Sequence, residues 1–102
     1  MSVVYTSNGF KIHPHRQAIE RDGEFIFVRP KTFALLLLLI KHPQEVLTKK
    51  YLLEQIWDDV AVEEAVLVQS IRELRQLFNN NEVIQTYPRK GYAWSADIQT
   101  HL

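Results

Sequence analysis

The sequence predicts an α+β domain in which an antiparallel sheet precedes three helices and a C-terminal β-hairpin. Three observations lead to this prediction. Turn residues interrupt short β-prone runs up to residue 29, an apolar stripe at helical spacing runs through residues 62–78, and two further strand-like runs flank a turn within residues 82–97. With 102 residues, the chain has the length of one domain with its own core. We therefore expect a single domain over 1–102, with the sheet in 1–29, a three-helix core in 30–79 and the hairpin in 82–97.

Turn signals divide the N-terminal third into strands. Ser7-Asn8-Gly9 separates two β-prone runs, and Asp22-Gly23 favours a type I′ hairpin turn between residues 17–21 and 24–28. Residues 25–28 are all apolar, a pattern typical of a strand covered on both faces. We therefore expect this last strand to lie in the centre of the sheet.

Proline and threonine mark the limits of the first two helices. Pro30 suits the first turn of a helix, where its missing N–H costs nothing, and Pro43 follows the end of the leucine-rich segment 31–41. This segment is predicted to be the central core helix. Thr48 is a good N-cap for a second helix, whose apolar face ends at Trp57.

The third helix is amphipathic. Its apolar stripe has the spacing i, i+4, i+7 and i+11 and consists of Leu67, Ile71, Leu74 and Phe78. The opposite face carries small, amide and guanidinium side chains, namely Ala65, Gln69, Arg72 and Gln76, with Val68 and Arg75 on one flank and Glu73 on the other. Taken alone, such a face also fits an ordinary solvated helix, so its function has to be inferred together with the C-terminal hairpin.

A basic turn comes after this helix. Residues 83–87 and 92–96 form the predicted hairpin, and its tip, Pro88-Arg89-Lys90-Gly91, carries two positive charges. An exposed helix fits the DNA major groove, which is roughly 12 Å wide, and a cationic hairpin beside it reaches phosphates or the minor groove. The pattern therefore predicts a winged helix-turn-helix that binds double-stranded DNA.

Composition restricts the other functions. Twelve basic and twelve acidic residues cancel, so the chain lacks the positive net charge usual for nucleic-acid binders. It has no cysteine, and His13-Pro14-His15 offers two histidines on an extended segment without a third ligand nearby, so we predict neither a metal nor a cofactor. Since no nucleophile–base set or glycine-rich phosphate loop is present, we predict that the protein is not an enzyme.

Motifs along nearly the whole chain resemble the OmpR/PhoB-type winged-helix effector domain. The first set comprises Pro30-x-Thr32-Phe33, Leu36-Leu37, His42-Pro43, Val46-Leu47-Thr48 and Leu52-Leu53-x-x-Ile56-Trp57. The second set is similar to the ToxR/CadC branch of that family and comprises Val66-Leu67-x-Gln69-Ser70-Ile71-x-x-Leu74-Arg75 and Ile84-Gln85-Thr86-x-Pro88-Arg89-Lys90-Gly91-Tyr92.

The resemblance implies an N-terminal four-stranded sheet, a third helix at about 63–78 in the major groove, and a wing at 88–91. The base contacts that it implies are Gln69, Arg72 and Val68, because glutamine pairs with adenine, arginine with guanine, and an apolar side chain with the thymine methyl group. The DNA backbone contacts that it implies are Thr48, Ser70, Arg75, Arg89, Lys90 and Tyr92, with Arg89 reaching the minor groove. The loop that touches RNA polymerase in this family corresponds here to Asp58, Asp59, Val60 and Ala61.

The chain departs from the family pattern at Ala65, Ser70 and Glu73, where basic residues are frequent. Glu73 has three possible roles: reading a cytosine amino group, pairing with a basic residue, or repelling phosphate. We expect repulsion, because it explains a neutral domain that ignores bulk DNA. The rival hypothesis is a winged helix that binds another protein, in which Glu63, Glu64 and Glu73 deter DNA.

The ToxR/CadC branch begins with this module and continues into a transmembrane helix and a periplasmic sensor. Since Met1 lies almost on the first strand, the resemblance implies a cytoplasmic one-component regulator tethered to the inner membrane by a C-terminal segment beyond Leu102. The longest apolar run, 33–40, is far shorter than the roughly 20 residues that cross a bilayer. Modest affinity per copy also leads us to expect binding as homodimers or at tandem sites.

Overall fold

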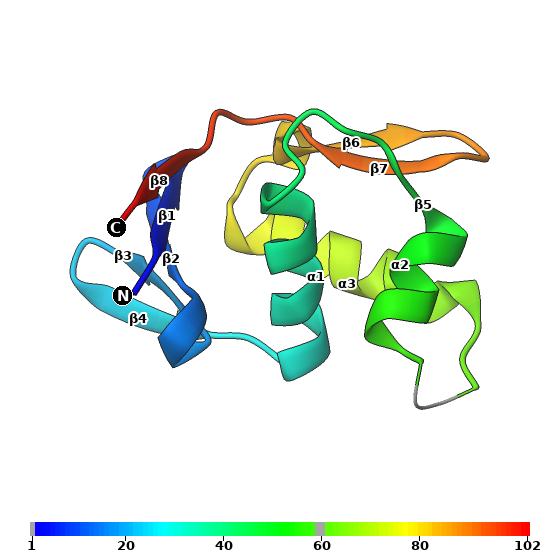
Figure 1. The fold of residues 1–102 in the computed structure, drawn as a ribbon, viewed down its shortest axis with the longest axis horizontal. Coiled ribbons are helices and arrows are strands. Elements are labelled where there is room, and N and C mark those ends of the chain that lie inside the picture. The colour runs from blue at the N-terminus through cyan, green and yellow to red at the C-terminus, as the bar shows by residue number, and fades with distance from the viewer. Residues whose placement is uncertain (1, 59–60) are drawn as a thin grey trace.

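The computed structural model describes residues 2–58 and 61–102. Figure 1 shows an N-terminal sheet at one end, three helices in the middle and a β-hairpin that projects at the opposite end. The molecule measures 36 × 26 × 25 Å along its principal axes. This arrangement agrees with the predicted winged helix-turn-helix.

The first sheet has five strands in the order β4-β3-β2-β1-β8. Its members are β1 (Val4–Ser7), β2 (Phe10–His13), β3 (Ala18–Arg21), β4 (Glu24–Phe27) and β8 (Gln99–His101), and a short 3₁₀ helix η1 (Pro14–Arg16) connects β2 to β3. The predicted turn is present, with positive φ at both Asp22 (52°) and Gly23 (82°), as a type I′ turn requires. The four expected strands are joined by a fifth, because β8 pairs antiparallel with β1.

The prediction that β4 is a central, covered strand is wrong. β4 lies at the edge of the sheet, and all four of its residues are exposed, with Phe27 at 74%. Ile26 lies opposite the buried Ile19, on the side of the sheet that faces the core, whereas Phe25 and Phe27 lie on the other side. Phe25 is shielded only in part, by the Arg16 guanidinium 5.2 Å from its ring centre and by the His13 ring at 5.5 Å. The continuous apolar run therefore reflects an open edge and not burial on both faces.

The helical core follows the predicted limits closely. The helices are α1 (Pro30–Ile40), α2 (Lys49–Ile56) and α3 (Glu64–Leu77). Pro30 occupies the first turn of α1, and the Thr48 hydroxyl accepts a hydrogen bond from the backbone N–H of Tyr51 at 3.1 Å, which caps α2. Leu36, Leu52 and Leu67, one from each helix, have no exposed surface. Packing of the three helices on one another fixes the orientation of α3.

The hairpin belongs to a second sheet of three strands in the order β5-β7-β6. These are β5 (Leu47–Thr48), β6 (Ile84–Tyr87) and β7 (Gly91–Trp94), and the 3₁₀ helix η2 (Asn81–Val83) leads from α3 into β6. Trp94 is fully buried, and its ring packs edge-on against Phe78 with centroids 5.2 Å apart. Its Nε1–H donates to the Ser7 hydroxyl at 3.3 Å. Trp94 therefore joins the wing to both α3 and the N-terminal sheet.

Candidate nucleic-acid interface

The exposed face of α3 is the one that periodicity predicted. The stripe residues Leu67, Ile71, Leu74 and Phe78 are at most 2% exposed. The exposed side chains of α3 are Glu64, Ala65, Val68, Gln69, Arg72 and Gln76. Arg72 Nη1 lies 3.5 Å from Gln69 Oε1, so two of the three predicted base-reading residues are neighbours at the centre of this face. Amide and guanidinium groups arranged in this way can bond to base edges in a major groove.

Arg75 links α3 to the wing. Its Nη2 donates to the carbonyl oxygen of Ile84 at 2.6 Å and to the Thr86 hydroxyl at 2.8 Å. Its Nε is buried without a hydrogen-bond partner among the described residues. The sequence suggested a contact with the DNA backbone, but the guanidinium is directed at β6. Arg75 therefore fixes the angle between the helix and the hairpin.

A groove of about 470 Å³ separates α3 from the wing. It is lined by Val68, Ile71, Arg72, Arg75, Gln76, Asn81 and Tyr92. Tyr92, a predicted backbone contact, is only 5% exposed and forms part of the groove wall. Its small accessible part restricts any contact to a partner that enters the groove.

The wing tip carries two exposed cations. Arg89 has a positive φ of 64° in the turn, and neither Arg89 nor Lys90 forms an ion pair with another residue among 2–58 and 61–102. The carbonyl oxygen of Lys90 accepts the backbone N–H of Lys49 at 3.2 Å, so the tip is joined to the start of α2. Thr48, a further predicted backbone contact, is exposed beside this link. The tip is therefore held next to Thr48 and the start of α2, while the base of the wing borders the groove beside α3.

The prediction that Ser70 contacts the DNA backbone is wrong. Ser70 is 1% exposed, and its hydroxyl lies 3.0 Å from that of Thr32 on α1. Its position at i+3 from Leu67 and i−4 from Leu74 places it on the buried side of α3, so helical spacing already contained this information. Ser70 is a packing residue between α1 and α3.

Glu73 forms an ion pair within the domain. Its Oε1 accepts hydrogen bonds from Arg29 Nη2 at 2.9 Å and Nε at 3.3 Å, and from the Thr32 hydroxyl at 2.7 Å. Since Thr32 donates its proton to Glu73, Ser70 must donate to Thr32. The structure therefore contains the pairing alternative, and the expectation that Glu73 repels phosphate stays a prediction.

These contacts set the charge state of Glu73. Burial raises the pKa of this carboxyl, but the hydrogen bonds from Thr32 and Arg29 and the charge of Arg29 outweigh burial and lower it. Arg29 lies 44 residues away in sequence, and no local pattern pointed to it. The structure thus adds Arg29 and Thr32 to the residues that hold α3 in place.

We expect Glu73→Gln to destabilise the fold by about 1 kcal/mol at neutral pH, since one partner, Arg29, is well exposed. The pKa of Glu73 is lowered by folding, so its contribution is complete above the usual glutamate pKa and is lost as pH falls through the folded value. Urea unfolding of both proteins at pH 7 and in acid measures this. Exposed Glu63, changed to Gln, is the control. A Glu73→Gln deficit that stays constant with pH would contradict the assignment.

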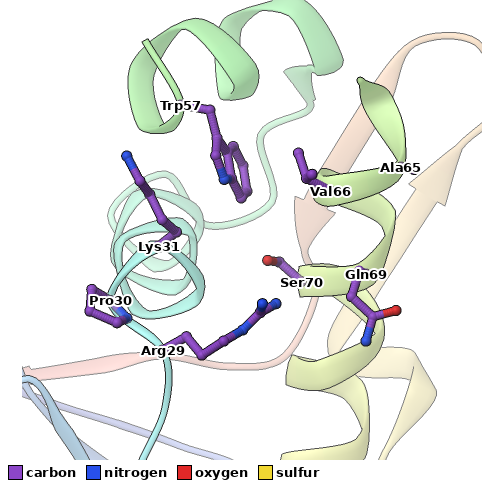
Figure 2. Close-up of a pocket in the computed structure, with 8 residues that line it drawn as sticks. All are labelled: Arg29, Pro30, Lys31, Trp57, Ala65, Val66, Gln69 and Ser70. Atoms are coloured by element: carbon purple, nitrogen blue, oxygen red, sulfur yellow. The ribbon is translucent and has the colours of Figure 1, made fainter. Parts of the chain in front are cut away.

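A second hollow of about 730 Å³ lies on the other flank of α3. Figure 2 shows Trp57 and Val66 at one end of it, and Arg29 reaching from α1 toward Ser70. It adjoins the connection between α2 and α3, in which polymerase contacts were expected. Asp58 and Ala61 are exposed there, whereas Asp59 and Val60 lie outside the described residues.

The described ranges 2–58 and 61–102 contain neither a cluster of metal-ligating side chains nor a membrane-spanning helix. No three histidine, aspartate or glutamate side chains there gather in a way that could hold a metal ion. None of the helices in these ranges combines the length and apolarity that crossing a membrane requires.

Comparisons with known proteins agree with this geometry. The profile of a family described as "Transcriptional regulatory protein, C terminal" matches residues 23–94. The transcriptional activator CadC of Escherichia coli K12 is 31% identical over 86 residues, which cover 79% of this chain and 17% of CadC. The regulatory protein CutR of Streptomyces coelicolor is 33% identical over 85 residues, which cover 82% of this chain and 39% of CutR. The chain thus spans well under half of either relative.

Solved structures show the same fold. The DNA-binding domain of Escherichia coli CadC superposes with a TM-score of 0.83 at 28% identity and covers 96% of each chain. The DNA-binding domain of Escherichia coli CpxR superposes with a TM-score of 0.77, covering 92% of this chain and 98% of that one. At 22% identity, the CpxR likeness concerns the fold alone.

Proposed function

This chain belongs to the family of C-terminal domains of transcriptional regulatory proteins, of the OmpR/PhoB type, and we propose that it binds double-stranded DNA in a sequence-specific manner to regulate bacterial transcription. The observation that carries the proposal is the exposed face of α3, which a groove separates from a wing whose tip carries two exposed cations without an ion-pair partner in the described part of the chain. α3 enters the major groove, and the wing lies on the backbone or in the minor groove.

The proposed roles follow from exposure. Gln69, Arg72 and Val68 read bases, since they project from the exposed face of α3. Lys90 and Thr48 contact the DNA backbone, Arg89 enters the minor groove, and Tyr92 takes part only through the groove. Arg75 positions the wing.

Affinity per copy is modest in this proposal, because the chain has no net charge. With about four to six phosphate contacts, log K falls against log salt with a slope of roughly −3 to −5. Tandem copies, a homodimer or tethering to a membrane through a segment beyond this chain would raise the effective affinity.

The test begins with selection of bound duplexes from a random pool, followed by gel shifts across salt concentrations. Lys90→Ala should weaken binding to every duplex alike, because a phosphate contact reads no base. Arg72→Ala should in addition relax the preference at one base pair by roughly 1–3 kcal/mol. Glu45→Ala, exposed on a loop before β5, is the matched control and should change neither.

Failure to bind any duplex at low salt would support the rival function, a protein-interaction module. Of the three glutamates invoked for that rival, two are paired inside the domain: Glu64 with Lys49 at 3.4 Å and Glu73 with Arg29 at 2.9 Å. Their charges therefore deter DNA less than the sequence suggested. If Lys90→Ala and Arg72→Ala both weakened binding to every duplex by the same factor, Arg72 would be assigned a contact with the DNA backbone and not with a base.

We propose further that residues 1–102 act as one effector domain without enzymatic activity. The connection that includes Asp58 and Ala61 contacts RNA polymerase, supported by its position beside the hollow at Trp57. The domain works in the cytoplasm, at the inner membrane if the full protein shares the organisation of CadC-like regulators.

A further inference from the structure

The outer edge of β4 is apolar, and no strand of the described residues lies beside it. Phe25 is 40% exposed, Ile26 36% and Phe27 74%, so three of the exposed large apolar side chains of the described chain lie in this one strand. β3 is the only strand that pairs with β4 among the described residues. Such an edge presents a row of free backbone groups together with apolar side chains, a combination that favours pairing with another strand.

The hairpin turn determines which backbone groups are free. Arg21 and Glu24 flank the two-residue turn and form the last register pair of β3 and β4. In a hairpin with a two-residue turn, this pair exchanges backbone hydrogen bonds. Hydrogen-bonded pairs and pairs without hydrogen bonds then alternate along the two strands. Ile26, opposite Ile19, therefore bonds toward β3. The N–H and C=O groups of Phe25 and Phe27 point away from the sheet.

We propose that two copies of this domain pair through β4, antiparallel and two-fold symmetric about Ile26. In this register Phe25 of each copy lies opposite Phe27 of the other, and these two residues hold all the outward-facing groups. Each Phe25–Phe27 pair exchanges two hydrogen bonds, as an antiparallel ladder requires. Ile26 of one copy lies opposite Ile26 of the other, between these two pairs. A register shifted by one residue would require hydrogen bonds from Ile26, whose N–H and C=O groups already bond to β3. The shifted register is therefore excluded.

Charge complementarity supports the same register. Glu24 begins β4, Asp22 lies in the turn before it with Arg21 3.7 Å away, and Arg29 follows the end of the strand. Antiparallel pairing brings the acidic start of one strand to the basic end of the other, at both ends of the interface. Arg29 keeps 62% of its side chain exposed while bound to Glu73, so it can contact a second carboxylate. A parallel arrangement would oppose like charges instead.

The interface is small. β4 has four residues, and a stable dimer typically buries about 1,200–2,000 Å². Pairing is therefore weak in dilute solution and forms where copies are concentrated, as on adjacent DNA sites. Figure 1 shows β4 and the wing at opposite ends of the molecule, so pairing through β4 leaves the wing free.

Cysteine cross-linking tests the register directly, because the chain has no cysteine. In the proposed pair the two Ile26 Cα atoms are about 4.5 Å apart, within the range of a disulfide. Ile26→Cys should form a disulfide-linked dimer under mild oxidation. Glu24→Cys on the same strand is the matched control. In the proposed register, residue 24 of the partner lies about 13 Å along the strand from the position opposite Glu24, too far for a disulfide. Ile26→Cys should cross-link faster, on the order of tenfold, and adding Phe27→Lys should abolish that difference.

A mixture of Phe25→Cys and Phe27→Cys proteins gives the same test without changing Ile26. It should form mixed dimers in preference to either self-linked dimer, because these two positions face each other. Equal cross-linking rates for Ile26→Cys and Glu24→Cys would show that the disulfides form by random collision of two molecules. This result would overturn the proposal. So would a folded Ile26→Cys protein that stays monomeric. No DNA is present, so this failure is distinct from a failure of DNA binding.

Discussion

Trp94→Ala is expected to lower the free energy of unfolding by about 3–5 kcal/mol, a large part of the 5–15 kcal/mol typical of a single domain. Trp94 is fully buried and packs edge-on against Phe78, which in turn packs against Phe10 with ring centroids 4.6 Å apart. The substitution therefore opens a cavity where the wing, α3 and the first sheet meet. Urea unfolding followed by circular dichroism measures the loss.

Trp94→Phe is the control for this change. It keeps an aromatic ring against Phe78 but removes the Nε1–H that donates to Ser7, so it should cost less, about 1–2 kcal/mol. If the alanine and phenylalanine variants were equally destabilised, the hydrogen bond and not the ring packing would dominate at this junction.

Gly91→Ala is expected to destabilise the wing by about 1–3 kcal/mol or more, because a methyl group has no space there. A Cβ at Gly91 would lie 1.9 Å from the carbonyl oxygen of Leu47 and 2.9 Å from the Cα of Thr48. Both are backbone atoms, which cannot turn aside as a flexible side chain does. The β5–β7 pairing must separate, and the link between the wing tip and α2 goes with it. DNA affinity should fall together with stability.

Gly9→Ala separates this steric effect from the general cost of replacing glycine. Gly9 has a φ of +82°, but nothing lies within 4 Å of the position that a Cβ would take, so only backbone strain of about 1 kcal/mol is expected. Thermal unfolding of both variants gives the comparison. A Gly91→Ala protein as stable as Gly9→Ala would show that β5 and β7 can move apart freely.

Sequence alone predicted the features that depend on neighbouring residues. The Asp22-Gly23 turn, the start of α1 at Pro30 and the Thr48 cap each rest on the conformational preference of one or two residues. The exposed face of α3 follows from its apolar spacing in the same way. These signals do not require knowledge of which distant segments meet.

Features that depend on distant segments were missed. β8 is a three-residue polar strand that becomes a strand only because β1 is available to pair with it. The position of β4 at the edge could not be distinguished from a central position, since both accommodate apolar residues. Glu73 was assigned a DNA-facing role because its partners, Arg29 and Thr32, come from the start of α1.

In the candidate interface, too, the sequence predicted what depends on neighbouring residues and missed what depends on distant segments. Periodicity identified Gln69 and Arg72 as exposed, because each position on a helix follows from the spacing of its apolar neighbours. The direction of a long side chain is not fixed by spacing. Arg75 lies on a flank of the same helix, yet its guanidinium is directed at Ile84 and Thr86, partners that only the packing of the wing supplies.

The pairing of β8 with β1 has a mechanical consequence. Val4 lies opposite His101, Tyr5 opposite Thr100 and Thr6 opposite Gln99, so the two chain ends leave the sheet side by side (Figure 1). A force that pulls these ends apart loads the Val4–His101 pair first and then the next two in turn. The hydrogen bonds between β1 and β8 therefore break one after another and not together, as they do when a chain end frays. β8 thus yields before tension reaches the three helices.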